Sequence, residues 1–210
     1  MCFFFENHQV LLSKAVAASS AFPPVLAPLR LDLSGETVTV PEGARFTDKE
    51  LQQRPVLVDG GVYDNLGLEP IWKRCGAIIA SYAGMNLKSQ PGNFALGHMY
   101  PVVNAFLASS IDWRKRVLVD LYQHRLIDGC KERIGSYWTA DTNIEAYPVR
   151  NGWRPTVTEL KEIANFPTRL KAMSPTTQRR AINSGYAFAD RGLRSHLLPE
   201  AAPPDGPPEV

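Results

Sequence analysis

Two short apolar runs constrain the fold of this chain more than any other feature. Residues 55–58 read P-V-L-V, and residues 77–82 read A-I-I-A-S-Y. Continuous apolar runs of this length are typical of strands buried on both faces of a parallel sheet. Residues 66–75 between them predict a helix, and strand, helix and strand in this order make a βαβ unit. We therefore expect an α/β fold with a mainly parallel sheet.

The first third of the chain predicts a helix followed by short extended segments. Residues 9–22 are rich in Ala and Leu, and Pro23 and Pro24 end this helix. Extended segments are expected at residues 25–33 and at residues 37–40, the second as an edge strand.

The second half of the chain is expected to be mostly helical. One helix places its apolar residues on one face and Arg114 and Lys115 elsewhere; that face holds Leu107, Ile111, Leu118, Leu121 and Tyr122. After it we expect a strand at residues 134–139 and a short helix at residues 158–164. Ser174 and Pro175 then form an N-cap and a first helical position, opening a long helix that ends near Leu197.

The composition excludes several classes of protein. The chain has 210 residues, 44% of them apolar and 21% charged, which is the composition of an ordinary globular domain. Its 23 Lys and Arg against 21 Asp and Glu leave too little positive charge to favour nucleic-acid binding. Residues 199–210 differ from the rest, since five of the twelve are proline, and we expect a disordered tail there.

The cysteines, the histidines and the hydropathy bear on disulfides, metal sites, membrane spans and cellular location. Three cysteines without a C-x-x-C pair and four scattered histidines predict neither a disulfide framework nor a metal site, and they fit a reducing compartment. Residues 89–111 carry no charge but include prolines, glycines and amides, so they do not predict a membrane-spanning helix. The expected location is the cytoplasm, with or without peripheral attachment to a membrane.

The stretch V-D-G-G-V-Y-D-N-L-G, at residues 58–67, is the most informative for function. Asp59 follows a predicted strand, where open α/β sheets place catalytic groups. Gly60 and Gly61 allow a sharp turn and leave room beside the carboxylate, and Asn65 is placed to cap the next helix. The alternative is that Asp59 only braces a tight turn, since D-G is a common turn pair.

A second stretch, S-K-A-V-A-A-S-S-A-F-P-P at residues 13–24, by itself fits a small-residue helix packed on a sheet. Together, however, A-S-S-A-x-P and the later strand-D-G-G resemble the patatin-like phospholipases. The segments N-F-P-T-R-L (165–170) and R-A-I-N-S-G-Y-A (180–187) are similar to the C-terminal region of a bacterial branch of that family. The resemblance covers most of residues 10–197.

This resemblance implies a lipid acyl hydrolase with a Ser–Asp dyad on an αβα sandwich, without a metal or an organic cofactor. A Ser in G-x-S-x-G attacks the acyl carbonyl, and the D-G-G aspartate, here Asp59, acts as its base. Gly60 and Gly61 complete the motif, and Asn65 supports it. The implied substrate is a lipid or lysolipid. A membrane surface is one place where such an enzyme meets it.

The sequence departs from the family because it contains neither G-x-S-x-G nor an upstream Gly-rich oxyanion loop. Only Ser81 stands in a partial match, and it follows Asp59 instead of preceding it. We therefore expect residues 1–198 to be the C-terminal portion of such a domain, a partial αβα sandwich with a helical C-terminal half. It is either the product of a truncated gene or a natural short protein that binds lipid or protein without catalysis. An uncovered sheet edge would then favour self-association.

The sequence offers three other candidates for a functional group. Ser19 or Ser20 could replace the nucleophile, although small residues on a helix more often serve packing. Asp59 and Asp64 could ligate a metal, but no third oxygen ligand follows at calcium-loop spacing. The run W-R-K-R at residues 113–116 could contact anionic headgroups, although a solvated helix face explains it more simply.

Overall fold

The computed structural model describes residues 4–5, 10–23, 26–35, 37–39, 42, 48–83, 95–123, 133–167 and 171–208. Parts of the segments considered above lie outside the described residues, namely residues 9, 24–25, 40, 89–94, 168–170 and 209–210. The chain divides into two units, each discontinuous in sequence. Unit 1 holds residues 1–65 and 89–111, and unit 2 holds residues 66–88 and 112–210.

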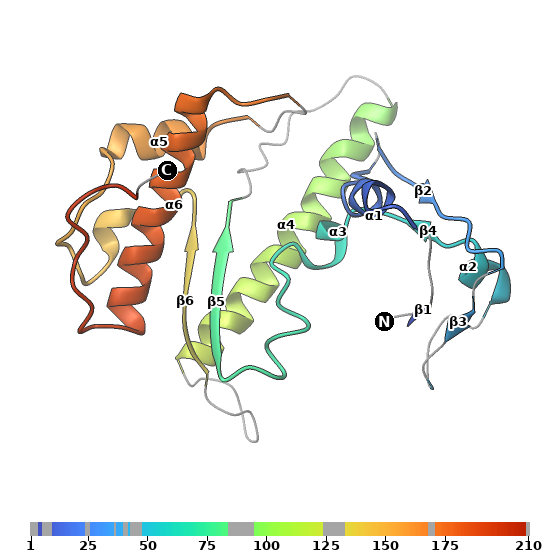
Figure 1. The fold of residues 1–210 in the computed structure, drawn as a ribbon, viewed down its shortest axis with the longest axis horizontal. Coiled ribbons are helices and arrows are strands. Elements are labelled where there is room, and N and C mark those ends of the chain that lie inside the picture. The colour runs from blue at the N-terminus through green and yellow to red at the C-terminus, as the bar shows by residue number, and fades with distance from the viewer. Residues whose placement is uncertain are drawn as a thin grey trace. The chain divides into compact units, whose positions relative to one another are not determined.

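The described residues form a mixed α/β protein with a small parallel sheet (Figure 1). In unit 1 the elements are β1 (Phe4–Phe5), α1 (Leu12–Ser19), β2 (Leu29–Arg30), β3 (Val38–Thr39), α2 (Lys49–Gln53), β4 (Val56–Leu57) and α3 (Gly61–Asp64). Helix α4 (Ala95–Tyr122) contributes residues to both units. Unit 2 also contains β5 (Ala77–Tyr82), β6 (Ile134–Thr139), the short 3-10 helix η1 (Ile144–Ala146), α5 (Val157–Ala164) and α6 (Pro175–His196).

The strand expected at residues 55–58 differs from the prediction of a buried parallel strand. β4 covers only Val56–Leu57 and pairs antiparallel with β2. Val56 is 48% exposed and Val58 is 44% exposed, so neither is buried on a sheet. An apolar run favours an extended backbone, but the partner strand and the covering layer come from distant residues, which the run itself does not specify.

The predicted βαβ unit is wrong in its pairing. β5 has the predicted bounds, but it pairs parallel with β6 and not with β4. The connection between β5 and β6 runs through α4. Residues 66–75 form turns and irregular backbone instead of a helix, since Gly67 has a φ of +62° and Pro70 follows soon after.

Helix α4 covers one face of the parallel pair. Leu118 packs with Ile78 and Ala80 of β5, and the Tyr122 hydroxyl donates to the Ile78 carbonyl at 2.8 Å. Twenty-eight helical residues extend for about 42 Å, whereas a six-residue strand extends for about 20 Å. Only part of α4 can therefore pack on β5 and β6.

Helices α5 and α6 form close to where the sequence predicts them. Thr156 caps α5 in a capping box with Glu159, and Ser174 caps α6 with Pro175 at its start. Figure 1 shows α6 alongside β6. Phe188 of α6 packs with Trp138 of β6 in a cluster that also includes Ile144, Tyr147, Leu160 and Ala187.

Part of the Pro-rich C-terminal segment, expected from composition to be disordered, contacts unit 2. The Pro204 carbonyl accepts a hydrogen bond from the Trp153 amide at 2.9 Å. Gly152 has a φ of +99°, and a Cβ at this position would lie 3.1 Å from Pro204. Glycine at residue 152 therefore meets two needs at once, a left-handed backbone and a close approach of the C-terminal segment.

None of the helices in the described part of the chain combines the length and the apolar character needed to cross a membrane. This includes α4, the longest of them, whose bounds take in the uncharged residues 95–111.

Candidate functional site

Asp59 lies two residues after the end of β4, in a turn that contacts the end of α1. The Asp59 amide donates to the Ala21 carbonyl at 2.8 Å, and the Gly60 amide donates to the Ser19 carbonyl at 3.4 Å. Ala21 is 1% exposed, so this junction is tightly packed. The two segments that carry the family resemblance, D-G-G and A-S-S-A, are thus joined by backbone hydrogen bonds within unit 1.

The Asp59 carboxylate is half-buried and takes part in the turn. Its Oδ1 accepts a hydrogen bond from the Gly61 amide at 2.7 Å, and the Asp59 carbonyl accepts one from the Val62 amide at 3.0 Å. Oδ1 of Asp59 therefore braces the turn, as the alternative drawn from the sequence expected. A carboxylate has further acceptor capacity on its second oxygen, so bracing and proton transfer are chemically compatible.

Gly61 lies under two side-chain oxygens. A Cβ at this position would stand 2.6 Å from Asn65 Oδ1 and 2.9 Å from Asp59 Oδ1. The Asp59 and Asn65 side chains therefore converge over Gly61, and any side chain at residue 61 would displace them. Gly60 is different, because a Cβ there would meet nothing within 4 Å.

The predicted role of Asn65 as the cap of a following helix is wrong. Asn65 ends the short helix α3, with φ −69° and ψ −16°, and no helix follows at residues 66–75. The helical turn forms immediately after Asp59 instead, because the Asp59 carboxylate satisfies the Gly61 amide at its start. The sequence predicted a helix that begins at residue 66, whereas the helical turn begins at Gly61.

The candidate serines do not lie on a strand-to-helix turn. Ser19 is the last residue of α1, Ser20 follows it as the C-cap, and Ser81 belongs to β5. Both Ser19 and Ser20 are exposed. Across the described ranges there is also no group of three or more His, Cys, Asp or Glu that could hold a metal ion, and Asp59 and Asp64 belong to no such group.

The W-R-K-R run is only in part a solvated helix face, since Trp113 and Arg116 are exposed and Arg114 and Lys115 are not. Arg114 is only 7% exposed, and its guanidinium lies 5.9 Å from the centroid of the Trp113 ring. The Lys115 ammonium lies 4.9 Å from the centroid of the Tyr82 ring. Trp113, which is 56% exposed, meets Trp72 edge to face. Arg114 and Lys115 are thus engaged with aromatic rings of unit 2, and Arg116 is the exposed basic residue of the run.

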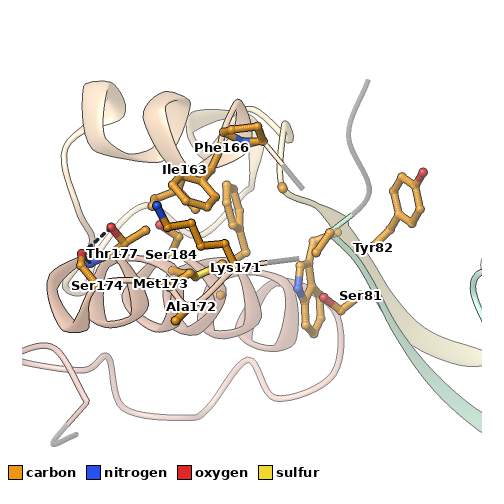
Figure 2. A pocket seen from close by; sticks show the side chains of 17 residues that line it. Ser81, Tyr82, Ile163, Phe166, Lys171, Ala172, Met173, Ser174, Thr177 and Ser184 are labelled. Carbon is orange, nitrogen blue, oxygen red and sulfur yellow. Dashed lines mark hydrogen bonds between the residues drawn. The ribbon is translucent and has the colours of Figure 1, made fainter. Parts of the chain in front are cut away.

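Unit 2 contains a cavity of about 570 Å³ that sequence reasoning missed (Figure 2). It opens where the parallel strands β5 and β6 end, which is where ligands bind in open α/β sheets. The lining residues come from the ends of β5 and β6, the end of α5, the described residues of the α5–α6 connection and one face of α6; among them are Tyr82, Trp138, Phe166, Met173, Ala181 and Phe188. The signal in the sequence was the spacing of residues 177, 181, 184, 185 and 188, which places them on one helical face.

Comparison with known proteins adds no relative: no family model, no curated protein and no solved structure matches this chain.

Proposed function

We propose that this chain is part of a patatin-like acyl-ester hydrolase that acts on a lipid or lysolipid, with Asp59 as the base of a Ser–Asp dyad. One observation carries the proposal. The D-G-G turn and the end of α1 are distant in sequence, and both belong to the family resemblance. Hydrogen bonds from Asp59 and Gly60 to the carbonyls of Ala21 and Ser19 join them.

In the proposed reaction, Asp59 accepts the proton of a Ser hydroxyl while the Ser oxygen attacks the acyl carbonyl. The proton then passes to the leaving alcohol, and water releases the acyl group by the reverse sequence. The hydrogen bond from the Gly61 amide to Oδ1 supports this role, because it fixes the orientation of the carboxylate. The nucleophile itself is proposed to come from outside these 210 residues, since they contain no G-x-S-x-G.

The second candidate is a non-catalytic module that binds lipid or protein. The same absence of G-x-S-x-G and of a Gly-rich oxyanion loop favours it, because these two elements provide most of the rate enhancement in such hydrolases. On this alternative, Asp59 only braces the turn that begins α3.

The test compares this chain with a longer product that also carries whatever the gene encodes in frame before Met1. We expect the 210-residue chain to react with no fluorophosphonate probe and to hydrolyse no p-nitrophenyl ester or lysophosphatidylcholine. We expect the longer product to do both. In it, Asp59→Asn should lower kcat by about 10²–10⁴-fold, the usual contribution of a general base.

The matched control is Asp64→Asn, which changes the other aspartate of the same turn and should leave kcat unchanged. An active longer product whose rate is insensitive to Asp59→Asn would refute the role of Asp59. A longer product that binds lipid vesicles but hydrolyses nothing would favour the non-catalytic module.

A further inference from the structure

The cavity in unit 2 has the form of a ligand site, and it involves none of the residues of the proposed dyad. Its volume of about 570 Å³ is in the range of pockets that enclose small molecules. On α6, three small residues line it, Ala181, Ser184 and Gly185. They lie between Thr177 and Phe188 on the same helical face, so a groove of small side chains runs along the helix.

The wall of this cavity is mainly aromatic and aliphatic. Trp138, Phe166 and Phe188 supply rings, Ile163 supplies a branched aliphatic side chain, and Met173 supplies a flexible one. The polar lining residues are hydroxyl-bearing, and two of them, Ser174 and Thr177, are hydrogen-bonded to each other at 2.9 Å, as the dashed line in Figure 2 shows. Such a wall favours an apolar ligand body.

One charged side chain, Lys171, is found among the residues that line the cavity, and no carboxylate is. Figure 2 shows Lys171 extending across the cavity between the α5 side, marked by Ile163 and Phe166, and the start of α6. An ammonium group at the edge of an apolar cavity attracts an anionic head group and disfavours a cationic one. The Lys171 ammonium therefore favours an anionic ligand and determines which end of the ligand lies at Lys171.

We propose that this cavity binds one long-chain carboxylate, with the hydrocarbon chain against Trp138, Phe166 and Phe188 and the carboxylate at Lys171. This site stands independently of the proposed hydrolase activity, although a fatty acid is also the product that such an activity releases. A lysolipid shares the acyl chain but carries a phosphodiester head group, and the experiment separates the two.

The experiment titrates the full chain by calorimetry with three twelve-carbon amphiphiles, each below its micellar concentration. We expect dodecanoate to bind with one-to-one stoichiometry and dodecyltrimethylammonium to bind at least about tenfold more weakly. Dodecylphosphocholine, the lysolipid-like probe, should lie between them. Lys171→Met should weaken dodecanoate binding about five- to tenfold, whereas Lys161→Met, an exposed lysine that does not line the cavity, should not.

Gly185→Leu tests the location of the site. A Cβ at residue 185 would meet nothing within 4 Å, and Leu favours a helix more than Gly does. We therefore expect this variant to melt at or above the wild-type temperature and to lose dodecanoate binding, because the new side chain fills the groove between Ala181 and Phe188. Equal binding of the anionic and cationic probes would overturn the carboxylate assignment. Undiminished dodecanoate binding by folded Gly185→Leu would overturn the site.

Discussion

At the scale of single residues, two adjacent glycines have different functions. Gly61 leaves room for the side-chain oxygens of Asp59 and Asn65, whereas Gly60 faces open space with ordinary helical angles of φ −60° and ψ −27°. Sequence inspection treats the pair as one motif. The structure separates a glycine required by packing from a glycine that only adds freedom to the unfolded chain.

We predict that Gly61→Ala destabilises unit 1 by about 1 kcal/mol, because the Asp59 carboxylate must give up its hydrogen bond from residue 61. Gly60→Ala is the matched variant and should stabilise the fold by about 0.4–1 kcal/mol. Urea unfolding followed by circular dichroism measures both. Equal effects of the two variants would show that the side-chain oxygens over Gly61 do not constrain it.

The sequence predicted part of this site and missed part of it. Asp59 after a strand, followed by a glycine turn, follows from local rules, because turn chemistry depends on neighbouring residues. The contact with Ala21 and the position of Asn65 over Gly61 were not predictable in the same way. They depend on where α1 ends and on the helical turn forming at residues 61–64 instead of at residues 66–75.

At the scale of elements, the sequence predicted α5, α6 and β6 with nearly their observed bounds, whereas the β4 strand was only partly right. The successful elements carry their own start signals, Thr156 with Glu159 for α5 and Ser174 with Pro175 for α6. The two-residue strand β4 depends on pairing with Leu29–Arg30, a long-range contact. Local sequence signals are therefore most informative for elements whose bounds are set by their own residues and not by distant contacts.

The capping box of α5 predicts a dependence of stability on pH. Hydrogen bonds from the Thr156 amide and hydroxyl hold the pKa of Glu159 below its ordinary value of 4.5. The folded state then binds fewer protons than the unfolded state. The contribution of Glu159 is therefore present above pH 4.5 and is lost as the pH falls through its folded pKa.

We expect the unfolding free energy of Glu159→Gln to vary less with pH than that of the wild type across this acidic window. Glu200→Gln, outside the capping box, should keep the wild-type slope. Urea unfolding at a series of pH values provides the comparison. Identical pH profiles for Glu159→Gln and the wild type would exclude the linkage.

Helix α6 also holds the segment that follows η1. The Arg191 guanidinium, on a residue only 2% exposed, donates to the carbonyls of Val149, Asn151 and Gly152. We predict that Arg191→Met destabilises the protein by about 2–4 kcal/mol, because three partly buried hydrogen bonds to backbone carbonyls are lost. Arg179→Met, at an exposed position of the same helix, should cost less than about 0.5 kcal/mol, and chemical denaturation distinguishes them. A similarly small loss of unfolding free energy in both variants would mean that water replaces the hydrogen bonds of Arg191.

At the scale of the whole molecule, the expected α/β class is confirmed, while the sandwich and the hydrolase remain proposals. Among the described strands, β5 pairs with β6 alone, and Ile79 in β5 is 53% exposed while its neighbour Ile78 is 1% exposed. A strand with one free edge and an exposed apolar face is a template for association. The parallel partner of β5 could not be predicted from the sequence, because it lies beyond α4.

We predict that the chain self-associates as its concentration rises and that Ile79→Lys reduces this association without unfolding the protein. A charge on an edge strand opposes edge-to-edge pairing. Ile78→Lys, one residue earlier and on the covered face, should instead prevent folding. Light scattering over a concentration series checks the first variant and thermal melting checks both. A monodisperse wild-type monomer would contradict the prediction.

The parallel pairing of β5 with β6 has a consequence for synthesis on the ribosome. Ala77 and its partner Ile134 are 57 residues apart (134 − 77), so at roughly 5–20 residues per second β5 emerges roughly 3–11 s before its partner strand. Leu118 of α4, which packs with Ile78 and Ala80, follows Ile78 by 40 residues (118 − 78) and so emerges roughly 2–8 s after it. Helices form within microseconds, so α4 can shield Ile78 and Ala80 only in the last part of this interval. The nascent chain therefore exposes β5 until the end of α4 is translated, and α4 protects it from then until β6 follows.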